Sequence, residues 1–319
     1  MVRLQAVLVL AITLLGCKAP MRPPSAGNAD TPENQAILGK LQGYMECLHA
    51  HSARNFQIAD LYRARLGSNA PTAETGAAVQ VSNDPKDCVE AIKVARPMEP
   101  SMRELETAGD AFATAAAEVF ELTTAAHAHW TRSSKDYDPA KGIALHPKLV
   151  AAFGAFDIAQ GALFDQVTRA NLAVRKDQRA RREQREGRTL VILVDEMMIH
   201  GEELVRFAST PWDRLDTIGL PAFTAKLTAI EDVVAEMTTL ALANPQETES
   251  TVAGFAILSD RAQTYLIAAR QLLQRARDHV TYSDAEKIMI GASNEVSVVG
   301  TPAAMIASYN NLVAVYVAR

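Results

Sequence analysis

Apolar residues recur at alternating intervals of three and four along most of the chain from Pro32 onward. This spacing places them on one face of an α-helix. The stripes are Leu38–Leu41–Met45–Leu48; Leu105–Ala108–Phe112–Ala115–Val119–Leu122–Ala126; Leu149–Phe153–Phe156–Gln160–Leu163–Val167; Leu190–Leu193–Met197–His200–Leu204–Phe207; Phe223–Leu227–Ile230–Val234–Met237; Leu258–Ala262–Tyr265–Ala269–Leu272–Ala276; and Ile306–Tyr309–Val313–Tyr316. A sustained period near 3.5 is typical of helices packed in bundles. We therefore predict an all-α protein, an elongated antiparallel helical bundle with long helices.

Local signals mark where these helices begin and end. Capping side chains followed by proline, which suits the first helical turn, predict starts at Asp30-Thr31-Pro32, Asn83-Asp84-Pro85 and Thr301-Pro302. Breaks are expected near residues 68–82, 133–146, 209–220, 244–250 and 282–300. A single glycine costs only about 1 kcal/mol inside a helix, so Gly187 leaves open one long helix or two. Residues 295–299 alternate with period two and are the one short strand candidate.

The first 16 residues have the layout of an export signal. Arg3 supplies a positive charge, and residues 6–15 form an apolar run too short to span a bilayer, which needs about 20 residues. The run ends in Leu14-Leu15-Gly16-Cys17, which resembles the lipobox of bacterial lipoproteins. That resemblance implies cleavage before Cys17 and a diacylglycerol on its sulfur, which anchors the chain in a lipid bilayer.

Residues 17–30 then form a lipidated N-terminus and flexible tether, since Pro, Gly, Ser and Asn dominate and no apolar period appears. In bacteria with two membranes, the non-acidic Lys18 favours the outer membrane. No other apolar run approaches spanning length. Residues 31–319 are expected to form the helical-bundle domain, as one body or as two lobes with a boundary near 209–220.

Composition narrows the function classes. Apolar residues make up 48% of the chain, enough for a real core, and the net charge is −5. A negative chain that is exported gives no electrostatic reason to bind nucleic acid. The two further cysteines, Cys47 and Cys88, are predicted to form one disulfide, because an oxidising compartment permits it and only one pairing exists. The alternative is two buried free thiols.

Several segments together resemble the YiiG-like family of bacterial lipoproteins. The segments, in chain order, are LQGYMECLHAHS with Tyr44 and Cys47, SNDPKDC with Asp84 and Cys88, DYDPAKGIALHPKLVAAF, REGRTL, and GTPAAMIASYNNLVAVY with Tyr309, Asn310 and Tyr316. The chain departs from the family pattern at His49 and at His129-Trp130. The resemblance implies a helical, membrane-anchored periplasmic protein. It implies no reaction and no catalytic residues, because the function of that family is unknown.

The common phosphate-binding, hydrolase and zinc motifs do not occur in the sequence. Glu196, His200 and Glu203 share one helix face and would ligate a metal if another helix supplied partners. However, His200 also lies at a core position of its stripe, which favours a buried, satisfied histidine. The pairs His49/His51 and His127/His129 are two residues apart, so each pair points to different faces and chelates poorly. We therefore predict no metal, no cofactor and no catalytic residue.

Two polar segments remain as candidate interaction surfaces. Residues 175–188 carry a local charge of +4; they either meet anionic lipid or an acidic partner, or form a solvated helix end with i, i+4 ion pairs. The segment 133–147 is long for a bundle connection. Its Tyr137, Lys141 and His146 are a candidate recognition site, and the alternative is a loop that caps the bundle.

These observations predict a lipid-anchored protein that faces the periplasm, with the outer membrane favoured. We expect a non-catalytic binding or scaffolding role, with an envelope protein as the partner. The alternatives are a protein that binds a small ligand or metal, and an enzyme that acts on envelope polymers.

Overall fold

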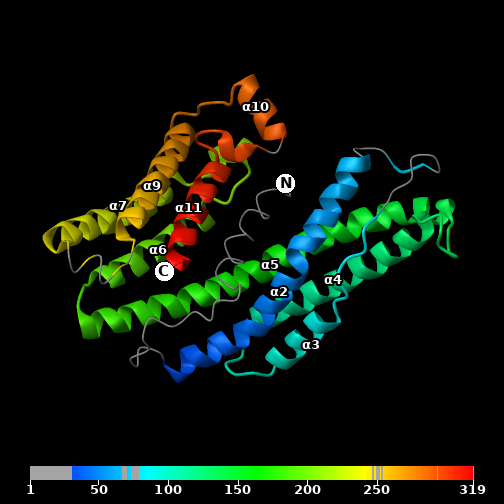
Figure 1. Ribbon diagram of the computed structural model, residues 1–319, viewed down its shortest axis with the longest axis horizontal. Coiled ribbons are helices and arrows are strands. Elements are labelled where there is room, and N and C mark those ends of the chain that lie inside the picture. Colours follow the sequence, from blue (N-terminus) through cyan, green and yellow to red (C-terminus); the bar gives the residue numbers. More distant parts are fainter. Residues whose placement is uncertain are drawn as a thin grey trace. The chain divides into compact units, whose positions relative to one another are not determined.

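A computed structural model gives the structure of the protein and describes residues 31–66, 70–72, 79–245, 248, 252, 254–292 and 294–318. Every regular element in these ranges is a helix, which confirms the predicted all-α class (Figure 1). The expected signal peptide (1–16), Cys17 and the tether (17–30) lie outside the described residues.

The contacts divide the chain into two compact units, with the division between Val174 and Arg175. The N-terminal unit contains α2 (Pro32–Leu66), α3 (Lys86–Ala95), α4 (Arg103–Trp130) and the larger part of α5 (Pro139–Glu186). The C-terminal unit contains the end of α5, α6 (Leu190–Phe207), η1 (Trp212–Thr217), α7 (Leu220–Ala243), α9 (Phe255–Arg277), α10 (Asp284–Gly291), η2 (Glu295–Ser297) and α11 (Pro302–Val317).

The sequence suggested a boundary near residues 209–220, and the structure divides the chain elsewhere. The helices on either side of that segment, α6 and α7, pack against each other in one core. The stretch 209–220, which lacks an apolar period, is therefore a connection within the C-terminal unit rather than a boundary between lobes.

The N-terminal unit has one core, to which each of its helices contributes an apolar face. The predicted stripe of α5 is buried from Leu149 to Val167, and the ring of Phe112 of α4 packs at a tilt against that of Phe156 of α5, with ring centroids 5.1 Å apart. The first helix departs from its predicted stripe. Its buried face is centred on Leu41, Tyr44 and Cys47, whereas Leu38 and Met45 are only half-buried.

The C-terminal unit has its own core, in which α9 packs on α7 and α11, and α6 packs on α7. The predicted stripes of α7 and α9 are buried throughout. A smaller apolar cluster of Tyr282, Ile290 and Val298 lies beside it, with the ring of Trp212 set edge-on to Tyr282. In that region residues 295–297 form a 3-10 helix, so the expected short strand was wrong.

Two of the three predicted helix starts show the expected capping chemistry; at the third, α3 begins at Lys86, and its N-cap residue Pro85 forms no side-chain capping bond. Thr31 Oγ1 accepts a hydrogen bond from the N–H of Asn34 at 3.1 Å, and Thr301 Oγ1 accepts one from Ala304 at 3.1 Å. These bonds satisfy N–H groups that a helix leaves unpaired in its first turn. The question at Gly187 is also answered: this glycine has φ +75°, which ends α5 at Glu186 and separates it from α6.

By length and composition, one described helix, α5, contains a stretch that would suit a membrane span. Core helices of soluble proteins pass the same test, and α5 supplies core residues to the N-terminal unit. This feature is therefore weak evidence for a span.

Candidate functional site

The segment 133–147, expected to be a long loop, is largely helical. The turns after α4 end at Asp138, and α5 begins at Pro139 and continues through Pro147. The carboxylate of Asp138 accepts hydrogen bonds from the N–H groups of Ala140 and Lys141 at 3.1 and 3.2 Å, so it caps the new helix. The expected loop was wrong, because Asp138 caps a helix that begins at Pro139, eight residues before Pro147.

The three candidate recognition residues have different surroundings. Tyr137 lies in the turn and is 41% exposed. The side chain of Lys141, on the first turn of α5, is 69% exposed and lies 3.5 Å from Asp138. Further along the helix, His146 Nδ1 lies 2.8 Å from the hydroxyl of Tyr62, whose pKa burial raises to about 12. The structure therefore does not gather the three into one site.

The two cysteines of the described region hold α2 and α3 together. The structure joins Cys47 to Cys88 by a disulfide, as the sequence predicted for an exported chain, and both residues are buried. One turn earlier on α2, a Cβ added to Gly43 would lie 2.9 Å from the carbonyl oxygen of Ala91 and from the Cβ of Ala95. Cys47 contacts Cys88, whereas the earlier Gly43 lies against the later Ala91 and Ala95. The two helices therefore run antiparallel, and they approach closely at Gly43.

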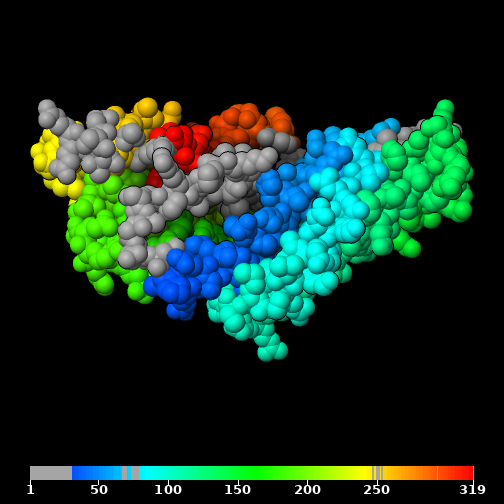
Figure 2. All heavy atoms as spheres, turned by 60° about the horizontal axis from the view of Figure 1, so that its bottom comes forward, coloured from blue at the N-terminus to red at the C-terminus, as the bar shows by residue number. Residues whose placement is uncertain are grey.

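A shallow groove of about 400 Å³ follows the line between α2 and α3. Figure 2 shows these two helices side by side on one face of the molecule. The groove is lined by Gly39, Gln42, Gly43, Glu46, Asp87, Glu90, Ala91, Val94, Ala95 and Met98. Its end near the disulfide is therefore acidic, and its other end is apolar, with the side chain of Val94 exposed.

A buried lysine fixes the other end of α3. Lys40 is 0% exposed, and its Nζ donates to the carbonyl oxygens of Arg96, Met98 and Pro100 at 3.1, 2.8 and 3.0 Å. Glu106 of α4 supplies the neutralising carboxylate. Buried ammonium groups require such partners, because an unpaired charge in the interior is costly. We call this set of contacts the Lys40 cage; it connects α2 to the end of α3 and the start of α4.

The Lys40 cage was missed in the sequence analysis. The available signal was a lysine four residues before buried Tyr44 and seven before Cys47, which puts it on the buried face of α2. A charge at such a position predicts a satisfied internal ion pair rather than a solvated one.

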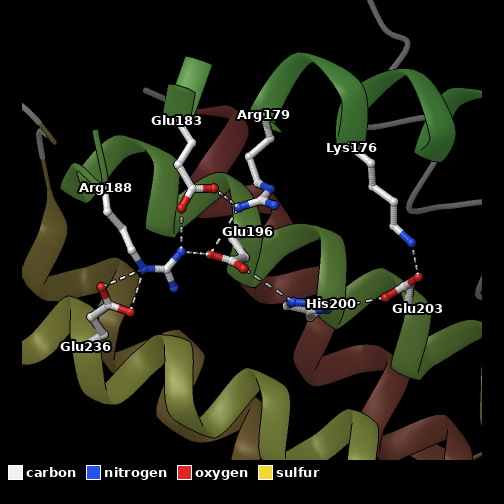
Figure 3. Close-up of polar contacts among 8 residues, drawn as sticks. All are labelled: Lys176, Arg179, Glu183, Arg188, Glu196, His200, Glu203 and Glu236. Carbon is white, nitrogen blue, oxygen red and sulfur yellow. Dashed lines mark hydrogen bonds and ion pairs between the residues drawn. The ribbon is translucent and has the colours of Figure 1, made fainter. Parts of the chain in front are cut away.

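In the C-terminal unit, a connected group of ion pairs joins α5, α6 and α7 (Figure 3). Its centre is Arg188, in the turn between α5 and α6. The guanidinium of Arg188 contacts Glu183 at 3.1 Å, Glu196 at 2.9 Å and both carboxylate oxygens of Glu236 at 2.7 and 2.9 Å. Arg179 also contacts Glu183, at 2.7 Å. We call these five residues the Arg188 cluster.

His200 lies beside this cluster rather than in the core. Its side chain is 30% exposed, its Nδ1 lies 3.3 Å from Glu203, and its Nε2 lies 3.7 Å from Glu196. The expected buried histidine was wrong, because the core stripe of α6 passes to one side of this residue. The two carboxylates are engaged by cations of α5, Glu203 by Lys176 and Glu196 by Arg179 (Figure 3). Within the described ranges, no group of three or more His, Cys, Asp and Glu side chains is arranged to hold a metal ion.

The basic segment 175–188 is neutralised within the chain. The two predicted i, i+4 pairs are present, Asp177 with Arg181 at 2.7 Å and Arg182 with Glu186 at 3.6 Å. Arg182 also reaches Asp195 of α6 at 2.9 Å. The segment thus holds α5 against α6. The predicted solvated helix end with i, i+4 ion pairs is therefore only part of its role.

Comparison with known proteins gives one match. Residues 35–318 match the model of a family described as a protein of unknown function, DUF3829. No curated protein matches the chain. No solved structure matches it either.

Proposed function

The chain belongs to DUF3829, a family of unknown function, and on that premise we propose that it is a lipoprotein of the bacterial cell envelope with a non-catalytic binding or scaffolding role. In this proposal, acylated Cys17 anchors the chain in a membrane, with the outer membrane favoured, and the helical units face the periplasm. The partner is a protein of the envelope.

The disulfide between Cys47 and Cys88 carries the proposal of an exported location. Disulfides persist in oxidising compartments and are rare in the reducing cytosol. The pattern Leu14-Leu15-Gly16-Cys17 independently supports a lipid anchor, since it follows an apolar run of export-signal length.

The engagement of charged side chains supports a role in binding rather than catalysis. Glu196, Glu203 and His200, the most suggestive polar group in the sequence, are part of an ion-pair network that holds helices together. The groove between α2 and α3 is the surface we assign to the partner, because it combines an apolar end at Val94 and Met98 with an acidic end at Glu46 and Glu90.

Membrane fractionation with and without Cys17 tests the anchor. We expect the wild-type protein in the membrane fraction, carrying label from an alkyne fatty acid, and the Cys17→Ser protein in the soluble periplasmic fraction without label. Lys18→Ala, which leaves the cysteine in place, is the matched control and should remain labelled and membrane-bound. Membrane retention of the Cys17→Ser protein would refute the anchor.

In-cell crosslinking followed by mass spectrometry tests the binding role. A photo-crosslinker at Val94, in the groove, should capture a reproducible envelope protein, whereas a crosslinker at the exposed Ile257 of α9 should not. The Ala91→Trp substitution, which fills the groove, should abolish crosslinking to the partner. Capture that is equal at both positions would contradict an assignment to the groove.

A further inference from the structure

The outer face of α5 is apolar where an exposed helix is usually polar. Ala151, Ala155, Ile158 and Ala162 are exposed, and Ile158 is 76% exposed. Intervals of three and four separate them, so they form one straight stripe along the helix, opposite the buried face that carries Phe153 and Phe156. We call this the α5 stripe; with its charged ends it consists of Lys148, Ala151, Ala155, Ile158, Ala162 and Asp165.

Burial within the chain does not account for this composition. The most apolar stretch of α5 contains few charged residues, and only 33% of it is buried. A Cβ added to Gly154, which flanks the α5 stripe, would meet nothing within 4 Å, so the internal packing does not require glycine there. Apolar residues that are contiguous on an exposed face, rather than scattered singly, point to an interaction surface.

We propose that the α5 stripe pairs with the α5 stripe of a second copy of this chain, antiparallel and about a two-fold axis. An isologous interface requires a surface that is complementary to itself. The α5 stripe is complementary to itself if the two-fold axis passes between Ala155 and Ile158. An antiparallel partner then sets Ala151 opposite Ala162 and Ala155 opposite Ile158.

The side-chain sizes fit this arrangement. Alanine at three of the four apolar stripe positions lets two helices approach at the close end of the usual range of about 8–10 Å. The one large side chain, Ile158, lies opposite the small Ala155 of the second copy, and the symmetry repeats that contact. Alternation of intervals of three and four is also the spacing of helices that pair over several turns.

The charges at the two ends select the orientation and the partner. The antiparallel arrangement brings Lys148 of one copy to Asp165 of the other, twice. A parallel pair would instead place like charges opposite each other. Asp165 also pairs with Arg169 of its own helix, so the contact between copies extends an existing ion pair. This charge pattern is independent of the apolar composition and points to the same second copy.

Sedimentation of the mature, unlipidated chain tests the pairing. The Cys17→Ser protein should sediment at twice the monomer mass at high concentration, and the Ile158→Glu variant should sediment at the monomer mass. Ile257→Glu, at another exposed isoleucine, on α9, is the matched control and should leave the dimer intact. A monomeric Cys17→Ser protein at the highest soluble concentration would overturn the proposal, as would a dimer of its Ile158→Glu variant.

Charge exchange and crosslinking test the orientation. Lys148→Asp should reduce the dimer, and adding Asp165→Lys on the same chain should restore it. In mixtures of tagged copies, a copy with Ala151→Cys should form a disulfide with a copy carrying Ala162→Cys, and Ala151→Cys copies should not link to each other. Linking of 151 to 151 would refute the antiparallel arrangement. Binding of the unlipidated chain to lipid vesicles, abolished by Ile158→Glu, would assign the stripe to a membrane instead and overturn the pairing.

Discussion

A single carboxylate oxygen of Glu106 accepts hydrogen bonds from the buried ammonium of Lys40 and from the backbone N–H of Met102, at 2.5 and 2.9 Å. The second bond caps the start of α4, and the first connects that start to α2. The ammonium and its hydrogen bond hold the pKa of Glu106 below its ordinary value. One carboxylate oxygen thus connects the start of α4 to the buried lysine of α2.

Lys40→Met is expected to destabilise the protein by about 3–5 kcal/mol, because it leaves Glu106 and the carbonyl groups without their cation in the interior. Urea unfolding monitored by circular dichroism measures the change. Lys287→Met is the matched control, since Lys287 forms an exposed pair with Asp284 and should change stability by less than about 1 kcal/mol. Equal losses in both variants would contradict the Lys40 cage.

Gly43→Ala should cost about 1–3 kcal/mol, because the new Cβ would lie 2.9 Å from Ala91 and Ala95 of α3. Gly154→Ala makes the same chemical change in a helix where the Cβ meets open space, and it should be neutral or stabilising by up to about 1 kcal/mol. Thermal melts of the two variants beside the wild type should move in opposite directions. A loss at Gly154 as large as that at Gly43 would mean that contact with α3 does not explain the loss at Gly43.

Acid should weaken the region around α10 through Glu286. Arg275 and the capping Ser283 lower the pKa of this carboxyl from an ordinary 4.5 to about 2. A lowered pKa adds stability that is fully present above pH 4.5 and lost as the pH falls through about 2. The difference in unfolding free energy between the wild type and Glu286→Gln should therefore shrink over this window. Asp284→Asn, which removes an exposed acid in the same helical turn, is the matched control.

Reduction of the disulfide should lower stability without removing the helices. The bond closes a loop with a sequence separation of 41, for which the chain-entropy model gives about 4 kcal/mol. Unfolding in urea with and without reductant measures the difference. Cys47→Ser/Cys88→Ser, already lacking the bond, should not respond to reductant. Mass spectrometry of the native protein should find these cysteines linked; two alkylatable thiols would refute the bond.

Arg188→Gln should destabilise the C-terminal unit by about 1.5–3 kcal/mol, because three carboxylates lose their shared charged donor. Arg270→Gln, which removes one exposed pair with Glu231, should cost less than about 1 kcal/mol. The loss at Arg188 should diminish at high salt, since salt screens the repulsion among the exposed parts of the remaining carboxylates. A loss that is the same for both arginines would argue against a connected cluster.

The periodicity of apolar residues was sufficient to predict the fold class and most buried faces. It succeeded at Leu149–Val167 and on α7 and α9, because a helix with one core face must repeat its apolar residues at intervals of three and four. The Cys47–Cys88 disulfide could likewise be predicted from the sequence, since two cysteines beyond Cys17 allow only one pairing between them.

Positions where polar groups are satisfied internally were harder to predict. Lys40 breaks the apolar pattern of α2 because its partners come from residues 96–106, which no local pattern connects to it. His200 follows the apolar spacing of α6 yet lies at the edge of the core, among carboxylates whose cations come from another helix. Asp138 starts α5 within an expected loop because its capping bonds outweigh the proline signal downstream. The surroundings of Lys40 and His200 depend on tertiary contacts, which a single sequence does not encode in its periodicity. The Asp138 cap is a local feature and lies outside the apolar pattern.

The bond between Cys47 and Cys88 also determines how the protein responds to proteolysis. A single cut anywhere between the two cysteines leaves both fragments covalently joined, so the nicked chain should migrate as one band on a non-reducing gel and as two bands after reduction. The Lys40 cage would still hold the far end of α3 to α2 in such a molecule. A nick in this segment would therefore be invisible to size measurements under native conditions, and the two helices would keep their register after the backbone between them is broken.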